Sequence, residues 1–104
     1  MEKVVWKGMI MPGMRNEYIK RHEEIWPEMV KALKESGICN YSIWNYGDEL
    51  FGYYECPNAE QAVNYKKNSA IMKKWSESMA NVMYMVKDPD IQSNAVYQKV
   101  FELE

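Results

Sequence analysis

Cysteine, glycine and histidine are all scarce in this chain of 104 residues, and each shortage argues against a class of site. The two cysteines, Cys39 and Cys56, lie far apart without CxxC spacing, so we predict reduced thiols and no disulfide framework. The five glycines are scattered and form no phosphate-binding loop, which gives little support to nucleotide or flavin binding. The single histidine cannot complete an HExxH zinc site, so we predict no metal.

Strong net charge and long apolar runs are missing as well. Thirteen basic and 15 acidic side chains give a formal net charge of −2, so the chain lacks the basic footprint of a nucleic-acid-binding protein. No stretch approaches the roughly 20 apolar residues that cross a bilayer. Glu2 and Lys3 interrupt the apolar residues at the N-terminus, which does not fit the pattern of a secretory signal peptide. We therefore predict a cytoplasmic protein that binds neither nucleic acid nor membrane.

Aromatic side chains, by contrast, are abundant: the chain has four tryptophans, eight tyrosines and two phenylalanines. Tyrosine and tryptophan combine an apolar face with a polar group, which suits both a core and a pocket for an amphipathic ligand. The hydrophobic fraction of 47% and the charged fraction of 27% are those of an ordinary globular protein. We predict a single domain over residues 1–104.

Apolar periodicity and turn residues divide the chain into alternating strands and helices. Pro27 interrupts the first helical stretch and predicts a kink or restart just after the histidine. Gly47-Asp48 predicts a hairpin turn. The predicted elements are a strand at 4–11, helix within 14–36, strands at 38–46 and 49–56, helices at 59–68 and 69–79, a polar loop at 87–94 and a closing strand at 95–103.

This order, β-α-β-β-α-β, predicts an α+β protein with the ferredoxin-like arrangement. In that arrangement the helices cover only one face of the antiparallel sheet, so the other face needs cover from a second subunit or a pocket. The aromatic content of the strands favours cover over exposure.

The segment around His22 is the first candidate for chemistry. Histidine is the side chain whose unperturbed pKa, about 6.5, allows proton transfer near neutrality. Tyr18 lies four residues earlier and therefore on the same helix face, which continues into the apolar residues Trp26 and Met29. We therefore expect His22 to point inward beside a tyrosine hydroxyl, where it is either an acid/base group or a core histidine bonded to a backbone carbonyl.

Three more residues of this segment and beyond have both a functional and a structural interpretation. Tyr41 shares a strand face with Cys39 and Ile43 and either presents its hydroxyl to a pocket or packs in an aromatic core. Trp75 lies on an apolar helix stripe and is either a ligand platform or a core residue. Arg21 either contacts the substrate or, as we expect, forms an ion pair with a carboxylate such as Glu24, Glu28 or Glu55.

A resemblance to a known family covers essentially the whole chain. The sequence is similar to the L-rhamnose mutarotase family, and the long RHxxIWPE run makes chance agreement improbable. The matching residues are Tyr18-x-x-Arg21-His22-x-x-Ile25-Trp26-Pro27-Glu28, Gly37-x-x-Asn40-Tyr41-Ser42-Ile43, Leu50-Phe51, Glu55, Trp75, Met79 and Phe101.

The resemblance implies a cofactor-free cytoplasmic enzyme that interconverts the α and β anomers of L-rhamnose. It implies a homodimer, a dimeric α+β barrel with two ferredoxin-like sheets face to face. By resemblance His22 is the proton donor, and Tyr18, Tyr41 and Trp75 bind the sugar, a monosaccharide. Ser76 stands where the family can carry a second tryptophan, and the loss of that ring bears on which sugar binds.

Mutarotation requires the ring oxygen of the hemiacetal to gain a proton while the anomeric hydroxyl loses one. On this hypothesis protonated His22 donates to the ring oxygen and recovers the proton on closure. Tyr18 orients the sugar or relays the proton at the anomeric hydroxyl. Trp75 offers its flat face to the C–H surface of the sugar.

Three alternatives remain open on the sequence. The chain could act as a mutarotase on another aldose, given Ser76. It could be a cofactor-independent monooxygenase on the same scaffold, because one fold hosts many chemistries. It could also be a sugar-binding module without catalysis.

Overall fold

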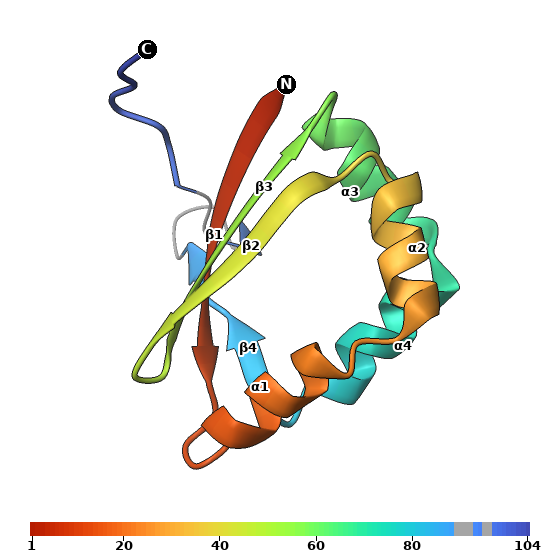
Figure 1. The fold of residues 1–104 in the computed structure, drawn as a ribbon, viewed down its shortest axis with the longest axis vertical. Coiled ribbons are helices and arrows are strands. Elements are labelled where there is room, and N and C mark those ends of the chain that lie inside the picture. Colours follow the sequence, from red (N-terminus) through yellow and green to blue (C-terminus); the bar gives the residue numbers. More distant parts are fainter. Residues whose placement is uncertain (89–92, 95–96) are drawn as a thin grey trace.

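The computed structural model describes residues 1–88, 93–94 and 97–104. The sheet has the antiparallel strand order β2-β3-β1-β4, which confirms the predicted α+β, ferredoxin-like arrangement. The four helices of the described residues all lie on one face of this sheet (Figure 1). Its elements are β1 (Glu2–Ile10), α1 (Arg15–Glu23), α2 (Pro27–Glu35), β2 (Cys39–Tyr46), β3 (Glu49–Cys56), α3 (Ala59–Asn68), α4 (Ala70–Met79) and β4 (Met83–Met85).

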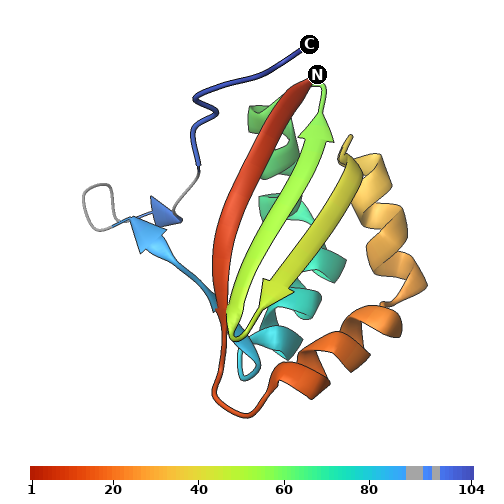
Figure 2. The same ribbon diagram turned by 60° about the vertical axis from the view of Figure 1, so that its left-hand side comes forward.

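The predicted helix break at Pro27 is confirmed. The helix α1 ends at Glu23, and α2 begins at Pro27 after Trp26 adopts an extended conformation with ψ of 134°. Proline is suited to the first helical position because its missing N–H would have no partner there. The break lets α1 and α2 follow different directions along the sheet, as Figure 2 shows from the side.

The predicted closing strand at 95–103 is wrong. Residues 95–96 lie outside the described residues, and 97–104 form no strand. The fourth strand is instead β4, which pairs with β1 from Ile10↔Met83 to Gly8↔Met85. It has only three residues and follows α4 almost at once, so it shows no alternation for a sequence pattern to detect.

The predicted polar loop at 87–94 also differs from the structure. Its two ends pair as short antiparallel strands, β5 (Lys87–Asp88) and β6 (Ser93–Asn94), and the residues between them lie outside the described part. Beyond them the chain returns to β1, because the backbone N–H of Tyr97 donates to the carbonyl of Val5 at 3.0 Å. The tail, residues 97–104, therefore returns to the edge of the sheet at β1. It does not form the regular hydrogen-bond pattern of a strand.

The core beneath the helices depends on a glycine. Trp6 on β1 is opposite Gly52 on β3, and a Cβ at Gly52 would lie only 2.0 Å from the Trp6 indole. Glycine therefore lets the indole lie flat across the neighbouring strand. Trp6 packs with Tyr18, Leu50 and further core residues, so α1 is fixed against the sheet through this cluster.

No helix of the described residues covers the opposite face of the sheet, where Phe51 packs against Tyr97 of the tail with ring centroids 5.8 Å apart. The row Lys7, Phe51 and Trp44 points away from the helices, because it alternates with the core row of Trp6, Gly52 and Ile43. Trp44 is 67% exposed and Tyr46 82% exposed. In the described ranges no helix is both long and apolar enough to span a membrane.

Candidate active site

The imidazole of His22 is held by its own helix. Its ring stacks on Tyr18, with the centroids 4.2 Å apart and the planes at 30°, as their spacing on α1 predicts. Nδ1 of His22 lies 3.0 Å from the Tyr18 carbonyl oxygen. A carbonyl only accepts hydrogen bonds, so Nδ1 carries the hydrogen. No described residue of the protein hydrogen-bonds to Nε2 of His22, which leaves that nitrogen for a ligand.

Burial sets the charge of this ring. It lowers the pKa of His22 below its ordinary value of 6.5, and the hydrogen bond to the Tyr18 carbonyl opposes this shift only in part. The imidazole is therefore neutral at physiological pH. Because Nδ1 carries the hydrogen, Nε2 has a free lone pair and is a base.

A pocket of about 290 Å³ lies between α1 and β2, beside this imidazole. The expectation that His22 points inward therefore agrees with the structure. Sequence reasoning did not identify Asn45, whose Oδ1 accepts a hydrogen bond from Arg15 Nε at 2.7 Å and thereby joins α1 to β2. The pocket is lined by Tyr18, Ile19, His22, Glu23, Ile43 and Asn45.

Tyr18 is a hydrogen-bond donor in this pocket. It is only 4% exposed, and burial raises the pKa of its phenol, with a further contribution from nearby Tyr41. The phenol therefore keeps its proton at any physiological pH. Tyr18 can orient a ligand, whereas its high pKa makes it a poor proton acceptor.

Tyr41 lies on the helix side of the sheet because it alternates with Ile43, as the period of two predicts, whereas β2 is irregular at its start. The register shifts between Cys39 and Ser42, where Asn40 has a positive φ of 49°. Although 37% of Tyr41 is exposed, its hydroxyl accepts a hydrogen bond from Trp6 Nε1 at 3.0 Å, and burial raises its pKa to about 12. Tyr41 borders the site through Tyr18 but does not line the His22 pocket.

Trp75 and Ser76 lie farther from the pocket. The Trp75 ring meets His22 edge-on, with centroids 5.5 Å apart and planes at 84°. It supports the imidazole from the α4 side and does not line the His22 pocket. Ser76 is exposed on α4 and lines neither of the two pockets described here. The structure thus gathers Tyr18, His22 and Trp75, with Tyr41 at the margin.

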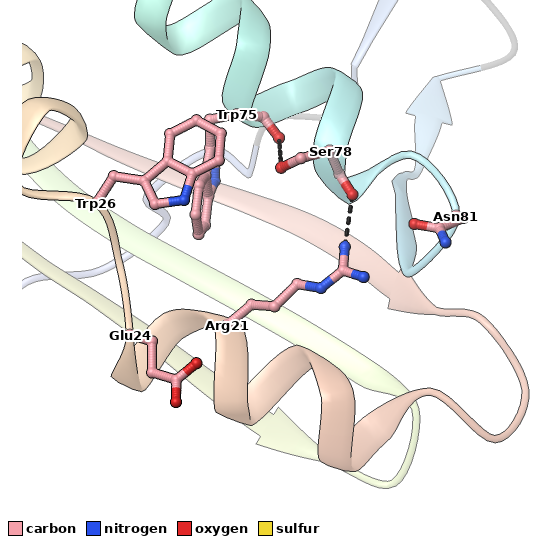
Figure 3. Close-up of a pocket in the computed structure, with 6 residues that line it drawn as sticks. All are labelled: Arg21, Glu24, Trp26, Trp75, Ser78 and Asn81. Atoms are coloured by element: carbon pink, nitrogen blue, oxygen red, sulfur yellow. Dashed lines mark hydrogen bonds between the residues drawn. The ribbon is translucent and has the colours of Figure 1, made fainter.

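A second pocket, of about 350 Å³, lies on the other flank of α1, toward α4 (Figure 3). Here Arg21 Nε donates to Glu17 at 2.8 Å, and Arg21 Nη1 donates to the Ser78 carbonyl at 2.5 Å. The expected ion pair of Arg21 exists, but its partner is Glu17 and not Glu24, Glu28 or Glu55. The lining residues are Arg21, Glu24, Trp26, Trp75, Ser78 and Asn81.

The described part of the chain holds no group of three or more His, Cys, Asp or Glu side chains that could bind a metal ion. Both cysteines are free thiols.

A family model and individual relatives of known description indicate the same protein family. A family model described as L-rhamnose mutarotase matches residues 3–103. The chain is 42% identical over 87 residues to an L-rhamnose mutarotase of Listeria monocytogenes, covering 80% of this chain and 81% of the relative.

Solved structures agree with this similarity. The crystal structure of an L-rhamnose mutarotase from Formosa agariphila is similar over 100% of both chains, with a TM-score of 0.78 and 29% identity. A dimeric ferredoxin-like protein from an uncultured marine organism is similar over 99% of both chains, with a TM-score of 0.59. At 14% identity, that second likeness concerns the fold alone.

Proposed function

The chain belongs to the L-rhamnose mutarotase family, and we propose that it interconverts the α and β anomers of L-rhamnose in the cytoplasm. The observation that supports this most is the state of His22: a neutral imidazole with a free Nε2 beside a pocket. The two free thiols suit a reducing compartment. Membership of this isomerase family favours mutarotation over the monooxygenase and the non-catalytic sugar-binding module.

The reaction moves one proton between two oxygens bonded to the same carbon. In ring opening the anomeric hydroxyl loses its proton, the bond between C1 and the ring oxygen breaks, and the ring oxygen gains a proton. The aldehyde then turns about the C1–C2 bond, and the ring closes on its other face. A single group that accepts and then donates a proton can serve both oxygens.

His22 is that group in our proposal. Because its resting imidazole is neutral, Nε2 takes the proton from the anomeric hydroxyl and then donates it to the ring oxygen as the C1–O bond breaks. His22 remains the proton donor that the family resemblance implies. The proton that it donates, however, comes from the substrate and not from a protonated resting state.

The binding residues have separate tasks. The phenol of Tyr18 donates a hydrogen bond to the sugar and orients it against Nε2. Tyr41 and Trp75 complete the site, the first through its hydroxyl near Tyr18 and the second by holding the edge of the imidazole. Ser76 lines neither pocket, and the ring that is missing at this position makes another 6-deoxy aldose the second candidate substrate.

A second copy of the chain is the proposed cover for the sheet face that the helices leave open. Exposed aromatic side chains lie on this face at both edges of the sheet: Trp44 and Tyr46 on β2, and Tyr84 on β4, at 67%, 82% and 49% exposure. The dimeric ferredoxin-like neighbour has the same fold. We expect the native protein to be a dimer by light scattering and Trp44→Ser to shift it toward monomer. A native protein that is monomeric at all concentrations would contradict this.

The activity is tested by NMR saturation transfer between the anomers of L-rhamnose. The native protein should accelerate exchange above the spontaneous rate, and His22→Ala should lose at least about a hundredfold of that acceleration. Lys20→Ala is the matched control, since Lys20 is exposed on the same helix and lines neither pocket. Full activity in His22→Ala would remove His22 from the mechanism. If the native protein is inactive, the assay is repeated with other aldoses.

A further inference from the structure

The His22 pocket has two walls, and the proposed proton transfer uses only one of them. His22 and Tyr18 both lie on α1. The other wall is formed by β2, which contributes the apolar Ile43 and the polar Asn45 to the lining. Asn45 is half-buried and has no part in the transfer of the proton. Its amide is the polar group that β2 presents to a bound ligand.

The amide of Asn45 is fixed in one orientation by its partners in the protein. Nδ2 donates to the carbonyl oxygen of Gly47 at 2.8 Å and to that of Glu49 at 3.0 Å, both at the hairpin between β2 and β3. Oδ1 accepts from Arg15 Nε at 2.7 Å. Carbonyls only accept hydrogen bonds and a guanidinium only donates them, so a flipped amide would lose all three bonds. Oδ1 is therefore held on the side of α1, the helix that forms the other wall of the pocket.

One hydrogen-bonding position of this amide remains open. Both hydrogens of Nδ2 are used at the hairpin, and an amide oxygen has two lone pairs, of which Arg15 occupies one. No other described residue donates to Oδ1. Asn45 can therefore accept one further hydrogen bond, and it has no hydrogen left to donate.

Acceptors also predominate among the other polar groups of the pocket. Nε2 of His22 has a free lone pair, and the carboxylate of Glu23 makes no hydrogen bond or ion pair within the described ranges. The phenol of Tyr18 is the donor of the set. A ligand that matches this pocket offers several hydroxyl hydrogens, whereas an anionic ligand is repelled by Glu23.

We propose that Asn45 is a specificity-determining residue, whose Oδ1 accepts a hydrogen bond from one ring hydroxyl of the sugar. The inference rests on the proposed function. His22 serves the two oxygens bonded to C1, so Asn45 on the opposite wall takes a hydroxyl at C2, C3 or C4. An acceptor at this place favours a hydroxyl over a hydrogen atom, an ether or a carboxylate at that carbon. Because the contact is remote from the breaking bond, it contributes to KM and not to kcat.

The first test compares two replacements of Asn45 with a replacement of its partner, by NMR exchange of L-rhamnose. Asn45→Leu removes the acceptor and should raise KM about three- to tenfold, as expected for one lost hydrogen bond, with kcat within about twofold of native. Asn45→Asp keeps an acceptor and loses both donors to the hairpin, so it should lower the melting temperature and leave KM within about twofold. Arg15→Met should leave KM unchanged, since the two hairpin bonds still orient the amide.

The second test uses the native protein and therefore does not depend on the folding of a variant. Methyl α-L-rhamnopyranoside has a fixed anomeric centre and is not turned over, and its 2-, 3- and 4-deoxy analogues each lack one ring hydroxyl. Titrations are followed through the side-chain amide signal of Asn45 by ¹H–¹⁵N NMR. The parent glycoside should shift this signal to saturation. The analogue without the partner hydroxyl should bind the native protein about three- to tenfold more weakly, and Asn45→Leu should bind it as well as the parent.

Three results would overturn the inference. The first is an equal rise in KM in Asn45→Leu and Asn45→Asp, which would assign the effect to the hairpin bonds. The second is a rise in Arg15→Met as large as that in Asn45→Leu, which would assign it to the link with α1. The third is an Asn45 signal in the native protein that the glycoside does not move.

The glycoside titration also separates this inference from the proposed function, because it needs no turnover. If the native protein accelerates anomer exchange while Asn45 does not respond to the glycoside, the inference about Asn45 fails alone. If the glycoside binds through Asn45 and anomer exchange stays at the spontaneous rate, the proposed function fails alone.

Discussion

The two flanks of α1, a helix of nine residues, use their basic side chains in opposite ways. On the β2 flank, the one hydrogen bond of the His22 ring among the described residues goes to the Tyr18 carbonyl of its own helix and leaves Nε2 free. On the α4 flank, the guanidinium of Arg21 donates hydrogen bonds to Glu17 and to the Ser78 carbonyl. The second bond joins α1 to the end of α4. The difference shows how one short helix can hold a reactive group without using that group as a structural contact.

The largest effect is expected on the β2 flank. His22→Gln keeps a side-chain N–H that can donate to the Tyr18 carbonyl but removes the titratable nitrogen. We expect it to lose at least about a hundredfold in kcat/KM with a melting temperature within a few degrees of the native protein. NMR exchange and thermal unfolding measure the two quantities. A variant that unfolds at much lower temperature would instead give His22 a structural role.

A smaller loss of activity is expected when the hydroxyl of the neighbouring Tyr18 is removed. Tyr18→Phe retains the ring that stacks on His22 and loses only the hydroxyl. The loss of one hydrogen bond to the sugar predicts a fall of about tenfold in kcat/KM. If Tyr18 were an essential proton relay, the fall would approach that of His22→Gln.

The smallest effect on catalysis is expected on the α4 flank. Arg21→Met removes the tie between α1 and the Ser78 carbonyl, where the arginine side chain is 29% exposed. We expect a free energy of unfolding lower by about 1–2 kcal/mol, after allowance for solvent screening, and kcat/KM within about threefold of native. Denaturant unfolding checks the first value. A hundredfold loss of activity in a stable Arg21→Met protein would mean that the two flanks are not separate.

Much of the fold could be predicted from the sequence because its signals are local. Pro27 ends one helix and begins the next, and Ser69 caps α4 by accepting from the Met72 N–H. The i, i+4 spacing of Tyr18 and His22 likewise predicts their stacking. Such features depend only on residues close together in the chain.

The remainder depends on contacts between distant residues. The strand β4 has only three residues and forms because it pairs with β1. A segment this short has no apolar periodicity from which a strand could be predicted. The irregularity in β2 at Asn40 has no sequence signal, and the contact of Trp26 with Trp75, at 5.1 Å between ring centroids, joins residues far apart in the chain. The lowered pKa of His22 has the same origin, because burial is a property of the packed molecule.

The pH dependence of anomer exchange tests the central claim, a neutral His22 that first accepts a proton. Burial lowers the pKa of His22 below 6.5, so the imidazole is in its active, neutral form throughout the neutral range. After subtraction of the spontaneous rate, kcat/KM of the native protein should be constant near neutrality and should fall only as pH drops below about 6.5. A kcat/KM that instead falls as pH rises through this range would show that protonated His22 is the active form.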